Sequence, residues 1–195
     1  MNRLIMNRLI LAVAAGGLLA GAGFAAAMAE AQIINTVKYN FSAQPWSLDP
    51  KFVKQEVSYP SDEKPGTIII STRRKFLYLI LGNGKALRYG IGVGRDGFKW
   101  YGSEKISRKA EWPDWHPPAE MRERDPTVPE YMAGGEDNPL GARALYLGNT
   151  LYRIHGTAQP WTIGTAVSSG CVRLTNEDVS DLYARVNIGN KVIVE

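Results

Sequence analysis

The sequence has 195 residues, 45% of them hydrophobic and 22% charged, which suits one globular domain with a real core. Its 23 basic and 19 acidic residues are nearly balanced, and loss of the first 29 residues would leave 21 and 19. This balance excludes the strongly basic surface of a nucleic-acid-binding protein.

Residues 1–29 have the features of a secretory signal peptide. Arg3 and Arg8 supply its positive charge, an apolar run follows over residues 9–27, and "AMA" at 27–29 offers small residues for cleavage. We therefore expect an exported protein. The alternative is an uncleaved anchor, since the apolar run is nearly long enough to span a bilayer; this segment is the only membrane contact that we expect.

Residues 30–65 are mixed in composition and interrupted by proline, and we interpret them as a linker with a short ordered lead-in. Strand patterns begin at residue 66, with "TIIIS" at 67–71 and "KFLYLI" at 75–80. Both alternating faces of the second run are apolar, which predicts a strand covered on both sides. "GNG" at 82–84 predicts a hairpin turn into "KALRYGIGVG", and "EKISRKAEW" at 104–112 continues the β pattern.

Residues 112–143 hold six of the eleven prolines and show little periodicity. A long irregular stretch inside a domain is typically functional, and we expect a lid or substrate-groove loop, with a packed surface loop as the alternative. Strands resume in "ALYLGNTLYRIHGT" at 144–157. "TNEDVSDLYARV" at 175–186 is the clearest helix, capped by Thr175, and "KVIVE" at 191–195 is a last strand. The sequence thus predicts a mainly β domain over 66–195, a β-rich α+β fold with one short helix.

The chain has a single cysteine, Cys171, and two histidines, His116 and His155. A cysteine nucleophile needs a neighbouring base to form a thiolate near neutral pH, and a third group to orient that base. His155 ends a predicted strand sixteen residues before Cys171, whereas His116 lies between a tryptophan and two prolines and is better interpreted as a loop residue. The alternative for Cys171 is a small buried hydrophobic residue.

The sequence contains no pattern typical of a metal site, a nucleotide-binding loop or a redox thiol pair. One cysteine and two histidines without ligand spacing predict no metal site, and no glycine-rich loop opens a helix after a strand, so we expect no cofactor. A redox protein that cycles a thiol pair is excluded, because no resolving cysteine exists.

The stretch from "IHGT" through "SSGCVRL" to "NEDVSDLY" resembles the L,D-transpeptidase catalytic domain, the YkuD-like family. The resemblance covers residues 66–195 and includes the upstream segments "PGTIIISTRRKFLYLI", "RYGIGVG" and "NPLGARALYLG". Ser169 and the segment "FKWYGSEKI" depart from the common family pattern. The positions that match the family motif are His155, Gly156, Thr157, Gly164, Ser168, Gly170, Cys171 and Arg173.

The resemblance implies a β-sandwich of mixed sheets and a peptidoglycan L,D-transpeptidase in which Cys171 is the nucleophile and His155 the proton acceptor and donor. It further implies that the Gly156 carbonyl orients the imidazole and that the Gly170 amide helps to stabilise an oxyanion. Arg173, Ser168 and Thr157 are candidate substrate-binding residues, although Ser168 also suits support of the cysteine turn and Arg173 a structural ion pair. No metal or cofactor is implied.

The implied partners are peptidoglycan stem peptides in the periplasm, at the cell wall. The acceptor of the acyl group stays open. A stem amine gives cross-linking, water gives an L,D-carboxypeptidase, and a protein lysine gives an enzyme that anchors an outer-membrane protein. A non-catalytic wall-binding scaffold is the alternative from another class.

Overall fold

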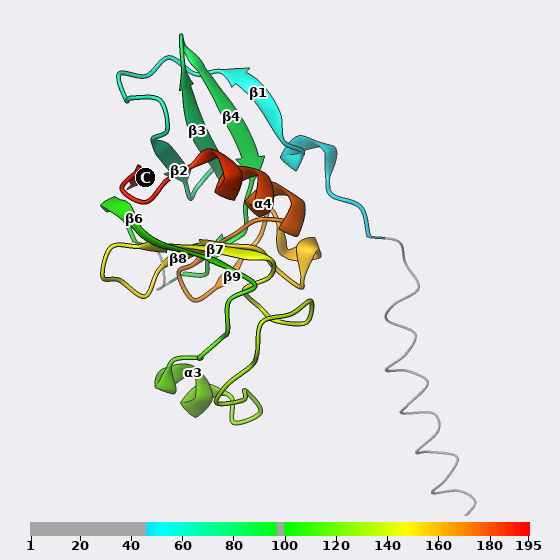
Figure 1. Cartoon of the computed structure of the whole chain (residues 1–195). Coiled ribbons are helices and arrows are strands. Elements are labelled where there is room, and N and C mark those ends of the chain that lie inside the picture. The colour runs from blue at the N-terminus through cyan, green and yellow to red at the C-terminus, as the bar shows by residue number, and fades with distance from the viewer. Residues whose placement is uncertain (1–45, 97–99) are drawn as a thin grey trace, which may run out of the picture. The chain divides into compact units, whose positions relative to one another are not determined.

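The computed structural model describes residues 46–96 and 100–195, and a nine-stranded sheet is its main element (Figure 1). Its strands lie in the order β1-β4-β3-β2-β11-β6-β7-β8-β10, and β5 and β9 form a separate parallel pair. The strands are β1 Gln55–Ser58, β2 Ile68–Ser71, β3 Phe76–Gly82, β4 Lys85–Gly90, β5 Val93–Gly94, β6 Gly102–Glu111, β7 Arg143–Leu147, β8 Arg153–His155, β9 Ala166–Ser168, β10 Val172–Arg173 and β11 Lys191–Val194.

The α-helices of the described residues are α3 Ala119–Arg124 and α4 Asn176–Arg185, and 3-10 turns occur at η2 Pro50–Phe52 and η3 Pro160–Thr162. Helix α4 begins where the sequence predicts, because the Thr175 hydroxyl accepts a hydrogen bond from the Asp178 N–H at 3.1 Å. Helix α3 was not predicted. Its six residues lack a side-chain cap and bury none of their side chains, so they leave no hydrophobic periodicity in the sequence.

The last strand, β11, joins the two halves of the sheet. It pairs in parallel with β2, Val192 opposite Ile68, and antiparallel with β6, Val192 opposite Glu104. Figure 1 shows β1 to β4 on one side of α4 and β6 to β8 on the other. The buried apolar side chains of α4, Val179 and Leu182, and Val186 directly after the helix belong to one core cluster with residues of both halves. The mixed, mainly β fold predicted from the sequence is therefore confirmed.

Strand β3 is covered on both faces, as its sequence predicts. Leu77 and Leu79 lie in the main core cluster, whereas Tyr78 and Ile80 belong to a second cluster on the opposite face of the sheet. Leu81, at the end of the run, is 36% exposed and marks the limit of this coverage.

The folded unit starts further upstream than residue 66, the boundary expected from the sequence, because Ser47–Glu195 form one compact unit. Strand β1 pairs with β4 over four residues, and Phe52 of η2 is buried against Phe76, with ring centroids 5.5 Å apart. The Phe52 ring also packs directly on the backbone of Gly164, where a Cβ atom would collide with it. Part of the expected linker is therefore a structural element of the domain.

The predicted signal peptide, residues 1–29, lies outside the described residues. Among the residues that are described, no helix has the length and apolar character needed to cross a bilayer.

Candidate active site

The predicted catalytic residues lie on one face of the strands β8 and β10. Ile154 and Val172 of these strands point into the main core cluster, so their sequence neighbours point the opposite way. The two strands pair in parallel with Arg173 opposite His155, which places Cys171, one residue before β10, next to Arg153. Four side chains therefore share this face. Arg153 lies beside Cys171, and two residues further along the strands His155 lies beside Arg173.

Cys171 sits in a tight turn between β9 and β10 that Ser168 and Gly170 shape. Gly170 has φ 104°, a conformation that other residues rarely adopt. The Ser168 hydroxyl donates to the Cys171 carbonyl at 2.6 Å and accepts from the Gly170 N–H at 3.3 Å. Ser168 is buried and its hydroxyl is used inside the turn, and the Gly170 amide expected to face an oxyanion has Ser168 as its partner here.

His155 is held by its own neighbour. Its Nδ1 lies 2.6 Å from the Gly156 carbonyl oxygen, and because a carbonyl can only accept, Nδ1 must carry the proton. In the neutral ring the lone pair is then on Nε2, the state needed for a base. The carbonyl of Gly156 is therefore in the position expected for the group that orients the imidazole.

Cys171 and His155 are diagonal neighbours on this face, with Cα atoms roughly 8 Å apart from standard strand spacing and rise. Among the described residues, no hydrogen bond joins the side chains of Cys171 and His155. The Cys171 thiol instead donates to the Leu151 carbonyl at 3.8 Å. Rotation about the Cys171 Cα–Cβ bond redirects the sulfur, and catalytic hydrogen bonds are often formed only when substrate binds.

The electrostatics of the site favour an uncharged pair. Burial lowers the pKa of His155 from 6.5 to about 3, helped by the charges of Arg173 and Arg153 and opposed by the backbone groups of Gly156 and Leu140. Burial also raises the pKa of the Cys171 thiol, while Arg153, and more weakly Arg173, act against this rise. At neutral pH the resting site therefore holds a thiol and a neutral imidazole, so the proton must move during the attack.

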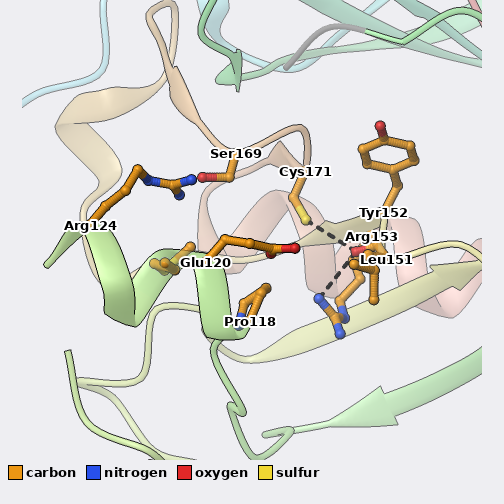
Figure 2. Close-up of a pocket in the computed structure, with 9 residues that line it drawn as sticks. Pro118, Glu120, Arg124, Leu151, Tyr152, Arg153, Ser169 and Cys171 are labelled. Carbon is orange, nitrogen blue, oxygen red and sulfur yellow. Dashed lines mark hydrogen bonds between the residues drawn. The ribbon is translucent and has the colours of Figure 1, made fainter. Parts of the chain in front are cut away.

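A cavity of about 320 Å³ opens over Cys171 and is closed on one side by α3 (Figure 2). Its lining includes Leu151, Arg153 and Ser169 from the catalytic face, and Pro118, Glu120, Met121 and Arg124 from the helix and its start. Met121 also lines two neighbouring cavities that contain Arg173, one of which contains Thr157. The segment 112–143, expected as a lid or groove loop, thus supplies a wall of each of these hollows.

Thr157 lies beside the site with its polar groups engaged in local structure. Its hydroxyl accepts from the Gln159 N–H at 3.0 Å, and its own N–H donates to the Asn176 side chain at 3.2 Å. Asn176 also accepts from the Ala142 N–H at 2.9 Å. Asn176 was not predicted as a residue that supports the site. The available indication was an amide side chain directly after the helix cap, Thr175.

Across residues 46–96 and 100–195, no three His, Cys, Asp or Glu side chains gather closely enough to hold a metal ion. The other histidine, His116, packs against Tyr131 with ring centroids 5.1 Å apart and is not among the residues that line the cavity over Cys171.

Comparison with known proteins places this arrangement in a family. The family model for the L,D-transpeptidase catalytic domain matches residues 65–194, which include His155, Cys171 and the whole of the face described above. The chain belongs to the L,D-transpeptidase family.

Curated relatives agree. The chain is 36% identical to the probable L,D-transpeptidase YbiS of Escherichia coli K12 over 148 residues. This match covers 72% of the chain. The match covers 47% of YbiS, so the chain spans about half the length of curated relatives of this kind.

Solved structures share the fold. A crystal structure titled probable carnitine operon oxidoreductase from Brucella melitensis is 50% identical, with a TM-score of 0.52, and covers 76% of this chain and 96% of its own. L,D-transpeptidase 3 of Mycobacterium tuberculosis has the same TM-score at 17% identity, covering 66% of this chain and 60% of its own.

Proposed function

We propose that this protein is a peptidoglycan L,D-transpeptidase that uses Cys171 as its nucleophile. The observation that carries the proposal is the His155–Gly156 hydrogen bond, which leaves Nε2 as the basic nitrogen on the face that also presents the lone cysteine. This combination stands within residues matched by the L,D-transpeptidase family model. A histidine base beside a thiol is the arrangement that acyl transfer through a thioester requires.

In the first half of the reaction, the Cys171 sulfur attacks the carbonyl between the diamino acid at stem position 3 and the terminal D-alanine. His155 Nε2 accepts the thiol proton and returns it to the departing amine, so D-alanine leaves and a thioester remains. In the second half, an amine of another stem attacks the thioester, loses a proton to His155, and the thiol is restored. The product is a cross-link between two third-position residues.

Backbone amides stabilise the oxyanion of the tetrahedral intermediate. The Cys171 N–H is adjacent to the attacking sulfur and is our first candidate donor. The Gly170 N–H contributes once it exchanges its long hydrogen bond to Ser168, at 3.3 Å, for the oxyanion.

Arg173 is proposed to bind the carboxylate of the diamino acid, because its guanidinium can form a bidentate pair. It lies opposite His155 and lines the two cavities beyond Met121. Thr157 lines one of these cavities, although its hydroxyl already accepts within the turn.

The acceptor is the open part of the function. Segment 112–143 walls the cavities on either side of Met121, and we propose that it selects among a stem amine, a protein lysine and water. The last two would make the protein an anchoring enzyme for an outer-membrane protein or an L,D-carboxypeptidase. The proposed location is the periplasm, in accord with the signal-like residues 1–29.

The test is incubation of the protein with tetrapeptide-stem muropeptides, followed by mass spectrometry of the products. We expect cross-linked dimers, free D-alanine and an acyl adduct on Cys171. The Cys171→Ala variant should form neither the adduct nor the products, and His155→Ala should slow adduct formation because the thiol loses its base. Identical products from the wild type and Cys171→Ala would refute the proposal.

A non-catalytic scaffold that only holds the wall is the competing function, and the reactivity of the thiol separates the two. A nucleophile that His155 activates should be alkylated by iodoacetamide at neutral pH in the wild type, and more slowly in His155→Ala. A thiol that is inert in both forms would favour the scaffold.

A further inference from the structure

A row of side chains leads across the sheet to Cys171 and has no place in the chemistry described so far. Arg108 of β6 lies opposite Tyr146 of β7, Tyr146 lies opposite Arg153 of β8, and Arg153 is next to Cys171. Tyr146 and Arg153 alternate with core residues along their strands, and Arg108 stacks on the Tyr146 ring, so the row runs over the same face as the thiol.

Arg153 is fixed in place by contacts on two sides. The Tyr146 ring lies between two guanidinium groups, 5.2 Å from that of Arg153 and 3.6 Å from that of Arg108. An Nη of Arg153 donates to the Leu151 carbonyl at 3.2 Å, and the Cys171 thiol donates to the same oxygen (Figure 2). The guanidinium and the sulfur therefore share one anchor.

The charge of Arg153 is not matched by a neighbouring acid. Among the described residues no carboxylate forms an ion pair with it, and its Nε is buried without a hydrogen-bond partner. The acidic residue in the same cavity, Glu120, extends from α3 into the cavity (Figure 2), is exposed to solvent and forms no ion pair with Arg153. An unpaired guanidinium fork in a cavity is suited to an incoming carboxylate.

We propose that Arg153 is a specificity-determining residue that binds the C-terminal carboxylate of the donor peptide. The inference rests on the proposed function, in which the carbonyl attacked by Cys171 is followed by a single residue that carries this carboxylate. One residue spans about 3.8 Å and neighbouring strands lie about 4.8 Å apart, so a carboxylate one residue beyond the sulfur falls within reach of the adjacent arginine.

The two arginines of the site face different hollows, which separates their roles. Arg153 lines the cavity that contains Cys171, whereas Arg173 lines the two cavities on the other side of Met121. A donor held by both would have its terminal carboxylate on Arg153 and its diamino acid on the side of Arg173. The prediction for Arg153 therefore concerns only the group at the donor's end.

The experiment compares two donors, a tetrapeptide stem with a free C-terminal carboxylate and the same stem with a C-terminal amide. For the wild type, kcat/KM for thioester formation should be roughly 10- to 100-fold higher with the carboxylate, the range of a charge-assisted hydrogen-bonded pair. In Arg153→Gln this ratio should fall to near one, chiefly through slower reaction of the carboxylate donor.

Arg88→Gln is the matched control. Arg88 also stacks on an aromatic ring, that of Phe76 at 4.3 Å, donates to a backbone carbonyl at 3.2 Å and has a buried Nε without a partner, but it lies on β4. It should keep the wild-type ratio. An unchanged ratio in Arg153→Gln, with both donors slowed equally, would overturn the proposal and leave Arg153 a merely structural residue.

A second measurement does not depend on turnover. N-acetyl-D-alanine should protect Cys171 from iodoacetamide in the wild type, N-acetyl-D-alaninamide should protect it far less, and Arg153→Gln should abolish the difference. Protection that is the same with acid and amide would overturn the inference. If the protection depends on Arg153 while no thioester ever forms, the carboxylate site stands and the transpeptidase proposal fails. If a thioester forms equally well from both donors, the transpeptidase proposal stands and the carboxylate site fails.

Discussion

Replacement of Asn176 by alanine should destabilise the protein and slow acylation together, although this side chain lies in neither catalytic row. Its Oδ1 accepts from the Ala142 N–H at 2.9 Å and from the Thr157 N–H at 3.2 Å. These two donors stand at the start of β7 and directly after the His155–Gly156 pair. One amide oxygen therefore ties the turn that holds the imidazole to the neighbouring strand.

The magnitude follows from the burial of those donors. Ala142 and Thr157 are 6% and 3% exposed, so alanine at position 176 would leave two N–H groups with poor access to water. An unsatisfied buried donor costs about 1–3 kcal/mol, so the two together cost about 2–6 kcal/mol, towards the lower end where a water enters the vacated space. For a folded unit of this size, such a loss lowers Tm by about 5–15 °C.

The assay is thermal unfolding followed by circular dichroism, paired with the rate of adduct formation on Cys171 by intact mass. The Asn176→Asp variant is the control, since it keeps an acceptor at the same place and adds negative charge in the first turn of a helix, where it is favourable. We expect it to lie close to the wild type in both measurements. A fall in Tm below about 2 °C for Asn176→Ala, or an equal fall for the aspartate variant, would refute the reasoning.

Phe52→Ala should cost about 3 kcal/mol, read as a lower urea midpoint, because Phe52 is a buried ring although it precedes residue 65; an unchanged midpoint would mean that η2 adds nothing to the domain. The pKa of His155 is lowered to about 3, so the stability it contributes is full above its unfolded pKa of 6.5 and is lost as the pH falls towards 3. The pKa of Asp178 is raised to about 6, mainly by burial, so its contribution has the opposite sign and is lost as the pH rises from 3.8 through 6. His155→Gln should therefore flatten the fall in Tm between pH 7 and pH 5, and Asp178→Asn should steepen it; parallel curves for all three proteins would contradict both assignments. Met121→Ala joins three cavities and should raise the share of hydrolysis over cross-linking severalfold, checked by the product ratio; an unchanged ratio would remove α3 from acceptor choice.

The elements with a local signal were predictable from the sequence. The two apolar faces of residues 76–80, the capping threonine of α4 and the turn at 82–84 each depend on neighbours within a few positions, and each is found as expected. The spacing of "IHGT" and "SSGCVRL" likewise pointed to the strands that carry the site, and the family match extends over both.

The features that were missed depend on partners far away in the chain. Strand β1 is stabilised by pairing with β4, and nothing in "QEVS" itself signals a strand. The proposed role of Arg153 depends on the pairing of β8 with both β7 and β10, because this pairing places Tyr146 on one side of Arg153 and Cys171 on the other. Register between strands is a tertiary property, and a single sequence without neighbours does not contain it.

The arrangement of charge connects specificity to catalysis in this site. Arg153 and Arg173 both favour the thiolate, yet both also disfavour a proton on His155, so in the empty site the transfer from Cys171 to His155 is opposed at its receiving end. A donor whose carboxylates pair with the two guanidinium groups would reduce that repulsion at His155 and would also reduce their support of the Cys171 thiolate, since each positive charge is then matched by a negative one. The substrate would thus bring the charge that allows His155 to hold the proton, and a peptide without those carboxylates would be a poor donor even if it fitted the cavity.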